Sequence, residues 1–311
     1  MDHAASPTRK GVVLAAGINS RSGDTHRLFA GLRYYFQTEG RFVAGDFVEA
    51  TYAGQYAGGR WTGPAPYDLR AFEYPLATLI ARCADWLAWL PRARPWVGEW
   101  HLVGYSLGGL LLLEAVTRLR HRAPDPWEGR LHSLTTLSSP LNGCNLGGFG
   151  WLADLFGPGR VGPEVVRLGE DPRHRWRIAN DVAHLRARGV RVTTLVQADD
   201  AVIQPEDGVV GPITPDLIVE TTAPPEDSLV ARHLGHGRIV HEPRVWARLL
   251  AIIGPQPAGA PPPPDAHEPA RVLVTPPPAA AASAPPPDDP LERELAELKA
   301  RLRAEGRLPP T

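Results

Sequence analysis

The sequence predicts an α/β protein with a mostly parallel central sheet and helices on both faces. Short apolar runs of strand character alternate along the chain with longer runs of helical character, a pattern typical of parallel strands joined by crossover helices. Polar residues whose side chains can take part in a reaction directly follow several of these strands. Ligands of such sheets bind at the carboxyl ends of the strands. With 311 residues and 43% hydrophobic content, the chain is long enough to bury one large core.

The elements follow one another from Gly11 onward. The first strand is a plain apolar run, the second has alternating character, and the helix between them has helical periodicity. Later, a run rich in β-branched residues predicts a buried strand, and Pro243 is well placed to open the last helix. The predicted strands are 11–16, 42–52, 99–105, 131–137 and 191–197, and the predicted helices are 26–37, 76–90, 107–120, 179–188 and 244–253.

The most informative motif is Gly104-Tyr105-Ser106-Leu107-Gly108, between an apolar strand and a long apolar helix. A serine on a sharp turn from a strand into a helix is the nucleophile elbow of serine hydrolases. The turn brings backbone segments close together and holds the serine in a sparsely populated conformation, so Gly104 and Gly108 must lack a Cβ. Ser106 is therefore the predicted nucleophile, at the positive end of the helix dipole.

Candidates for an acid and a base follow later in the chain. Asp199 and Asp200 come just after the predicted strand at 191–197, so an acid there lies at the same sheet edge as the elbow. His236 lies in a predicted loop, where catalytic histidines usually occur. His233 and His241 stand close enough to His236 to suggest a metal site, but no Glu or Cys has a recognised ligand spacing, so no metal ion is expected.

With these residues the chain resembles the α/β-hydrolases of the lipase and esterase type, over about residues 10–253. Beyond the elbow, the acid and the histidine, two segments carry the resemblance: Val12-Val13-Leu14-Ala15-Ala16-Gly17-Ile18-Asn19 and Leu137-Ser138-Ser139-Pro140-Leu141-Asn142-Gly143. The order serine, acid, histidine is that of this fold and differs from the order in two other triad folds. In the family the acid commonly precedes a short residue and two aliphatics, which favours Asp200 over Asp199.

The resemblance also implies an oxyanion hole and a lid. The backbone NH groups of Ile18 and Leu107 are the expected oxyanion donors. The family has His-Gly before the first of these donors, whereas this chain has Ala16-Gly17. Residues 142–175, which combine glycines with bulky apolar side chains, are the expected lid or cap; the alternative is an apolar flap that only completes the core.

The implied activity is hydrolysis of a carboxylic ester through a Ser106, His236 and Asp200 triad and an acyl-enzyme intermediate. The expected substrate is a small-molecule or lipid-like acyl ester, and no cofactor is expected. Two alternatives remain at this point: an acyltransferase or thioesterase that uses the same triad, and a non-catalytic scaffold that keeps the fold.

The composition of the chain indicates which classes of partner and which cellular location to expect. The chain has 33 basic and 34 acidic residues and a formal net charge of −1, which argues against a nucleic-acid partner. Residues 1–10 are expected to be a flexible amino terminus without a signal sequence, and no apolar run reaches the length of a membrane span, so we expect a cytoplasmic protein. Cys83 and Cys144 lie in unrelated contexts and are expected to be packing residues.

The composition changes abruptly after Ile253, the expected end of the catalytic domain that begins at residue 11. Residues 254–290 are dominated by proline and alanine, which predicts an extended, semi-rigid and disordered linker. Residues 291–307 are predicted to form a short charged amphipathic helix, with leucines at 291, 295, 298 and 302. This helix could mediate self-association or bind a protein partner, and we expect it to fold only on meeting that partner.

Overall fold

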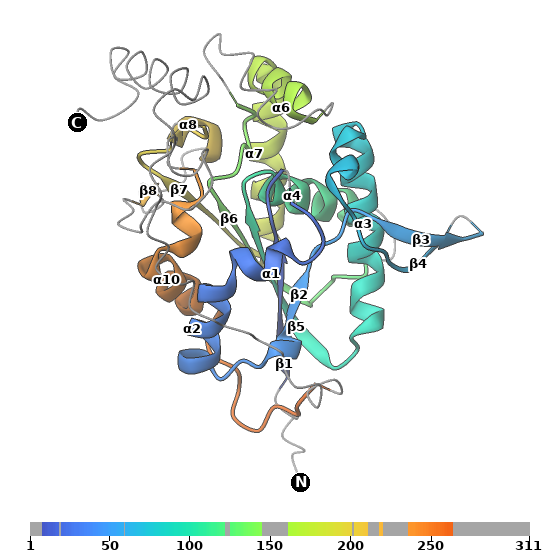
Figure 1. Cartoon of the computed structure of the whole chain (residues 1–311), viewed down its shortest axis with the longest axis vertical. Coiled ribbons are helices and arrows are strands. Elements are labelled where there is room, and N and C mark those ends of the chain that lie inside the picture. The colour runs from blue at the N-terminus through green and yellow to red at the C-terminus, as the bar shows by residue number, and fades with distance from the viewer. Residues whose placement is uncertain are drawn as a thin grey trace, which may run out of the picture.

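A single parallel sheet forms the centre of the molecule (Figure 1). The computed structural model describes residues 8–18, 20–58, 60–121, 125–144, 161–200, 202–210, 218–219 and 236–263. Within these ranges the strand order is β2-β1-β5-β6-β7-β8, and the neighbouring strands of this sheet pair in parallel, as predicted. The strands are β1 (Arg9–Ala15), β2 (Phe47–Glu49), β5 (Val97–Tyr105), β6 (Leu131–Leu137), β7 (Arg191–Gln197) and β8 (Ile218–Val219).

Helices cover both faces of the sheet because successive strand side chains point to opposite sides. The helices are α1 (Asp24–Leu28), α2 (Ala30–Gly40), α3 (Leu76–Ala93), α4 (Leu107–Arg120), α6 (Val161–Glu170), α7 (Pro172–Ala187), α8 (Pro205–Gly208) and α10 (Pro243–Ile253). Val12 and Leu14 of β1 belong to one apolar cluster, with α2 and α10, whereas Val13 and Ala15 belong to another, with α3, α4 and α7. Short 3-10 turns are η1 (Ala44–Asp46), η2 (Leu69–Glu73) and η4 (Arg238–His241).

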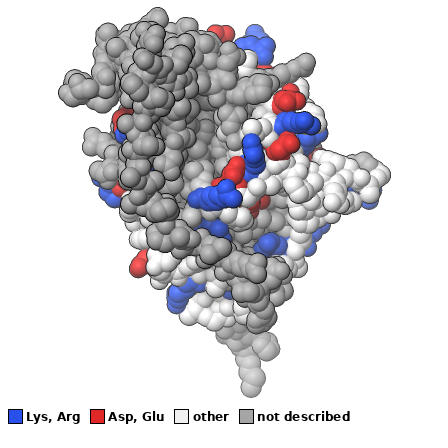
Figure 2. Space-filling model, viewed as in Figure 1, with Lys and Arg blue, Asp and Glu red and all other residues white. Residues whose placement is uncertain are grey.

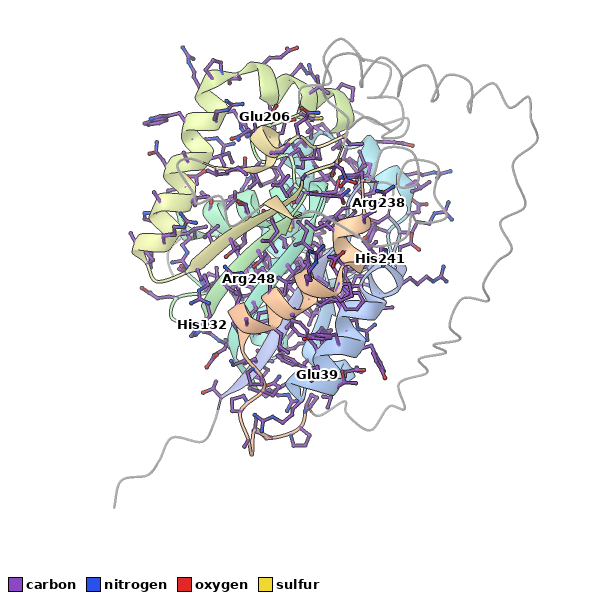
Figure 3. All side chains as sticks on the ribbon, turned by 90° about the vertical axis from the view of Figure 1, so that its left-hand side faces the viewer. Glu39, His132, Glu206, Arg238, His241 and Arg248 are labelled. Atoms are coloured by element: carbon purple, nitrogen blue, oxygen red, sulfur yellow. The ribbon has the colours of Figure 1, made fainter. Side chains whose placement is uncertain are left out.

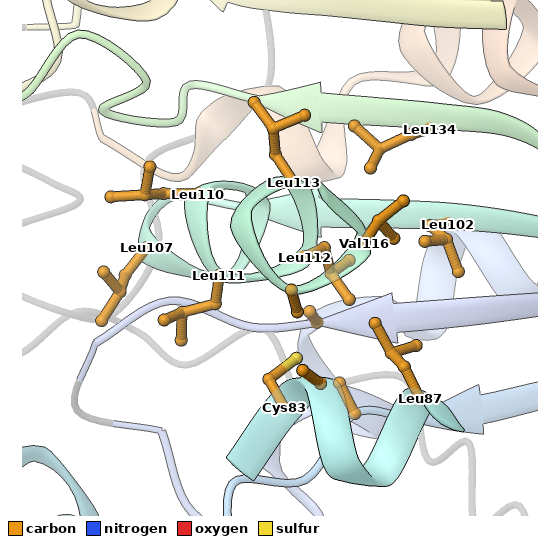
Figure 4. Close-up of a cluster of buried hydrophobic side chains, with 14 of the residues drawn as sticks. Cys83, Leu87, Leu102, Leu107, Leu110, Leu111, Leu112, Leu113, Val116 and Leu134 are labelled. Carbon is orange, nitrogen blue, oxygen red and sulfur yellow. The ribbon is translucent and has the colours of Figure 1, made fainter. Parts of the chain in front are cut away.

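The helix α4, which follows the predicted elbow, is buried along nearly its whole length. Figure 4 shows its leucines between α3, at Cys83 and Leu87, and the sheet, at Leu102 and Leu134. A helix that is apolar all round must be surrounded by protein, and each fully buried leucine contributes about 1.5–3 kcal/mol. This packing fixes the start of α4, and therefore Ser106, against the centre of the sheet.

The second strand is much shorter than the predicted 42–52. The segment from Ala44 forms the turn η1, and β2 extends only from Phe47 to Glu49. The Asp46 carboxylate accepts a hydrogen bond from Val43 N at 2.8 Å and another from Arg9 Nη2 at 2.8 Å. Such local bonds to the backbone compete with extended structure, so the alternating pattern overestimated the strand.

Two other stretches also differ from the expected elements. The predicted helix at 26–37 is divided into α1 and α2 by the fully buried Phe29. Between β2 and α3 lies an unpredicted antiparallel hairpin of β3 (Gly54–Ala57) and β4 (Arg60–Pro64). In the sequence two glycines stand between these strands, a pair typical of two-residue hairpins, so a signal for the hairpin was present.

The helix predicted at 179–188 begins earlier than expected. The expected helix at 179–188 is α7, which starts at Pro172 with the Asp171 side chain accepting a hydrogen bond from Arg173 N. An aspartate cap followed by proline at the first helical position is a recognised helix start. That signal lies in the segment that we assigned to the lid.

Both ends of the described chain extend beyond the predicted domain limits. Arg9 and Lys10, expected in the flexible terminus, belong to β1. After Ile253, the buried side chain of Gln256 donates to Lys10 O at 2.7 Å and accepts from Lys10 N at 3.0 Å. The first part of the predicted linker is therefore held against the sheet, whereas residues 1–7, 264–290 and the predicted helix at 291–307 lie outside the described residues.

Neither the surface charges nor the helices of the described residues depart from what the composition indicates. On the face shown in Figure 2, basic and acidic side chains of described residues are interspersed rather than gathered by sign. Among the helices of the described ranges, none combines the length and the apolar content that crossing a membrane requires.

Candidate active site

Ser106 lies on a sharp turn between β5 and α4, as the motif predicts. Its backbone has φ 53° and ψ −132°, a conformation that residues with a side chain rarely adopt. The side chain is 4% exposed. The surrounding sheet and helix fix this conformation, because Ser106 N donates to Leu137 O at 2.9 Å and Gly109 N donates to Ser106 O at 3.1 Å.

The glycines of the motif are required by close backbone contacts. A Cβ on Gly108 would lie 2.4 Å from Ala16 O and 2.6 Å from Ala15 O, and a Cβ on Gly104 would lie 2.5 Å from Gly109 Cα. Backbone atoms at such distances cannot yield as a flexible side chain can. The next residue, Gly109, is also crowded, since its Cβ would lie 2.0 Å from the side-chain atom Ser139 Oγ and 3.0 Å from the backbone atom Gly104 O. Gly109 directly follows Gly108 but lies outside the five-residue motif, which names only Gly104 and Gly108.

The structure brings Ser106, His236 and Asp200 into one hydrogen-bonded row. His236 Nε2 is 2.9 Å from Ser106 Oγ, and His236 Nδ1 is 2.7 Å from Asp200 Oδ2. All three side chains are buried, with His236 only 7% exposed. For Nε2 to accept the serine proton, Nδ1 must carry its own hydrogen and donate it to Asp200. The Tyr105 ring packs against the imidazole, with 5.0 Å between ring centroids.

Asp200 is fixed by its own backbone surroundings. Its Oδ1 accepts hydrogen bonds from Val202 N at 2.9 Å and Ile203 N at 3.0 Å, which leaves Oδ2 for the histidine. The two aliphatics that favoured Asp200 in the sequence are thus the residues whose amide groups hold its carboxylate. A carboxylate held in this way can orient the imidazole without moving itself.

The adjacent Asp199 points to a different partner. Its Oδ2 accepts from Arg238 Nη1 at 3.0 Å and its Oδ1 accepts from Gln197 Nε2 at 2.9 Å. Gln197 is fully buried and its Oε1 accepts from Ile239 N at 3.1 Å. Figure 3 labels Arg238 on the turn η4, directly before α10. Gln197 and Arg238, which sequence reasoning missed, therefore connect the end of β7 to the turn that carries His236.

The structure describes two of the three histidines of the suggested cluster, His236 and His241. Both ring nitrogens of His236 face Ser106 and Asp200, and His233 lies outside the described residues. Within the ranges that the structure describes, no three His, Cys, Asp or Glu side chains gather as possible ligands of one metal ion.

The segments that carry the two predicted oxyanion donors adjoin Ser106. A Cβ on Gly17 would lie 2.7 Å from Ser106 Cβ and 3.0 Å from its Oγ, so the loop after β1 passes directly over the serine. Ile18 follows in that loop, and Leu107 is the first residue of α4, where the helix leaves the amide N–H without an intrahelical acceptor. The site lies where β1 and β5 are neighbours and the strand order changes direction, the usual ligand position in open α/β sheets.

Only the ends of the expected lid are described. Residues 145–160 lie outside the described residues, whereas α6 and the start of α7 occupy the rest. The described ends are packed on the domain: Glu164 Oε2 accepts from Leu76 N at 2.6 Å, and Asn142 Nδ2 donates to Val209 O at 2.7 Å. These contacts hold both described ends of the segment against the domain.

No protein-family model matches the sequence, and no curated protein matches it. Among solved structures, a phospholipase from Legionella pneumophila in complex with thio-NAD is 12% identical with a TM-score of 0.46, and the match covers 78% of this chain but only 61% of the phospholipase. Metagenome-derived lipolytic enzymes match at 14% identity and a TM-score of 0.44, over 80% of this chain and 95% of theirs. A cutinase-like protein from Cryptococcus sp. matches at 13% identity and a TM-score of 0.42, over 82% and 98%.

The parallel strand order, the serine on the turn after β5 and the chain order of the acid and the histidine are all present in the described residues. In these features the chain resembles the α/β-hydrolases of the lipase and esterase type.

Proposed function

We propose that this protein is a serine hydrolase that cleaves a carboxylic ester through an acyl-enzyme intermediate. The observation that carries the proposal is the continuous row from Asp200 through His236 to Ser106, with contacts of 2.7 Å and 2.9 Å. A serine, an imidazole and a carboxylate in this order form the arrangement that activates a hydroxyl for nucleophilic attack. The strained backbone of Ser106 adds support, since such conformations persist mainly where function requires them.

The proposed first step is acylation. Ser106 Oγ attacks the ester carbonyl carbon while its proton passes to His236 Nε2, and Asp200 stabilises the resulting imidazolium. The carbonyl oxygen becomes an oxyanion that accepts hydrogen bonds from the NH groups of Leu107 and Ile18. When the oxyanion collapses, the bond to the leaving alkoxide breaks and His236 returns the proton to it, which releases the alcohol.

Deacylation repeats the sequence with water. His236 Nε2 removes a proton from a water molecule, whose oxygen attacks the acyl carbon. Collapse of the second oxyanion breaks the bond to Ser106 Oγ, which takes the proton back from His236. The acid is released and the serine is restored. The expected substrate is an acyl ester of small-molecule or lipid-like character.

The test is labelling of Ser106 by a fluorophosphonate, combined with turnover of p-nitrophenyl esters of graded acyl length. We expect Ser106→Ala to lose labelling and to lose turnover by about 10⁶-fold, as for triad serines elsewhere, while its thermal unfolding stays close to that of the parent. A variant that keeps turnover within about tenfold of the parent contradicts the proposal. Product analysis with an added alcohol distinguishes hydrolysis from acyl transfer.

A further inference from the structure

The loop after β1 has an unusual composition for the position that it occupies. It passes over Ser106 as Ala16-Gly17-Ile18, without the histidine that the family resemblance implies before Gly17. Tyr52 Oη donates to Ala16 O at 3.2 Å, but this bond holds the peptide before Gly17 and not the one after it. Glycine tolerates many backbone conformations, so the peptide between Gly17 and Ile18 could rotate unless something fixes it. This peptide carries the Ile18 NH group, the proposed oxyanion donor.

A serine hydroxyl holds this peptide. Ser20 Oγ donates a hydrogen bond to Gly17 O at 2.8 Å, and the Ser20 side chain is buried. Because a trans peptide is planar, its C=O and N–H bonds point in opposite directions. A bond that fixes Gly17 O on one side of the loop therefore also fixes the direction of the Ile18 N–H on the other side.

Ser20 is itself oriented by a tyrosine. Its Oγ lies 3.3 Å from Tyr67 Oη, and Tyr67 is buried, with its ring 5.3 Å from that of Tyr52. A serine hydroxyl has one hydrogen, and Ser20 uses it for Gly17 O, so Tyr67 must be the donor in their contact. Burial raises the pKa of the Tyr67 hydroxyl to about 12, which keeps its proton in place at neutral pH.

We propose that Ser20, oriented by Tyr67, is a positioning residue that directs the Ile18 NH toward the oxyanion. The hydroxyl chain from Tyr67 through Ser20 to Gly17 O thus takes over the bracing of a loop that has no histidine. The inference rests on the proposed function, because an oxyanion hole has a role only if Ser106 attacks a carbonyl group.

The first test is the kinetics of Ser20→Ala on a p-nitrophenyl ester. Loss of one oxyanion donor costs about 10²–10³ in kcat, and loss of its orientation should cost less, so we expect a fall of about tenfold in kcat with little change in KM. The inhibition constant of a trifluoromethyl ketone, which forms an oxyanion adduct with the serine, should rise by a similar factor. Ser20→Thr, which keeps the hydroxyl, should recover most of both values.

Matched variants separate positioning from loss of a buried hydrogen bond. Ser133 is a buried serine at the amino end of β6, far along the strand from the elbow, and its Oγ is 2.8 Å from His101 Nδ1. Ser133→Ala should lower the melting temperature without changing kcat or the inhibition constant. Tyr67→Phe should lower kcat, as Ser20→Ala does. Tyr56→Phe, on the exposed strand β3, should leave kcat unchanged.

The proposal is overturned if folded Ser20→Ala and Tyr67→Phe both keep kcat and the inhibition constant within about twofold of the parent. It is also overturned if Ser133→Ala reduces kcat as strongly as Ser20→Ala does. Failure of the proposed function looks different, because Ser106→Ala would then retain turnover. If turnover depends on Ser106 but Ser20→Ala has no effect, the positioning role of Ser20 is wrong and the proposed function stands.

Discussion

At the scale of single residues, two adjacent aspartates have different environments. The Asp200 side chain is fully buried and faces His236, whereas the Asp199 side chain is 31% exposed and pairs with Arg238. The Asp199 ion pair is partly exposed, and such pairs contribute about 0–1 kcal/mol. Asp200 is therefore the residue whose charge bears on the imidazole.

We predict that Asp200→Asn lowers kcat by about 10⁴, because an amide favours the wrong tautomer of the histidine and does not stabilise the imidazolium. Asp199→Asn should keep kcat within about tenfold and lower stability slightly. Both variants are compared at saturating concentration of one ester. The reverse pattern, with a large defect only in Asp199→Asn, contradicts the assignment of the acid.

At the scale of elements, the site depends on how closely α4 approaches β1. The elbow glycine Gly108 lies against the carbonyl groups of Ala15 and Ala16, and the adjoining Gly17 lies against Ser106. The same contact therefore packs the helix on the strand and sets the loop over the serine. Any increase in the spacing of α4 and β1 moves the proposed oxyanion donors apart.

We predict that Gly108→Ala lowers the melting temperature by roughly 2–12 °C, because overpacking costs about 1–3 kcal/mol and each kcal/mol shifts a domain of this size by about 2–4 °C. Turnover should fall as well, since the backbone must separate to accept the methyl group. The control is Gly63→Ala on β4, where a Cβ meets nothing within 4 Å. Differential scanning calorimetry measures both melting temperatures. Equal values for the two variants would contradict the steric role assigned to Gly108.

At the scale of the whole molecule, the chain beyond α10 returns to the start of the sheet. Gln256 bonds to both backbone groups of Lys10, its own N–H donates to Gly40 O at 2.8 Å, and Arg9 Nη1 donates to Pro261 O at 2.7 Å. Residues 256–261 thus connect the amino end of β1 with the end of α2. The structural domain extends to at least this point, past the boundary at 253.

We predict that a protein ending at Pro263 keeps the kcat and the melting temperature of the full chain. One ending at Pro255 should keep kcat, because Ser106, Asp200 and His236 all precede that point. It should melt at least about 4 °C lower, because four hydrogen bonds of about 0.5–1.5 kcal/mol each are lost. If the protein ending at Pro263 folds but lacks activity, residues after Pro263 contribute to the active site and the prediction is wrong.

Much of the fold and of the proposed site could be predicted from local signals. The alternation of strands and helices, the elbow glycines and the position of His236 before the last helix depend on periodicity and on steric rules that act over a few residues. The preference for Asp200 also had a local basis, since the following aliphatic residues supply the amide groups that hold its carboxylate.

Only the tertiary structure decided the contacts between segments that are distant in the chain. The pairing of Asp46 with Arg9 that accompanies the short β2, the bridge from Asp199 and Gln197 to η4, and the hydroxyl chain from Tyr67 to Gly17 have no periodicity to reveal them. Hydrogen bonding of a polar side chain depends on which partner the fold brings within about 3 Å. The sequence by itself therefore determined the fold class and the choice of the proposed reactive residues, and the packing of the loops around them was settled only in three dimensions.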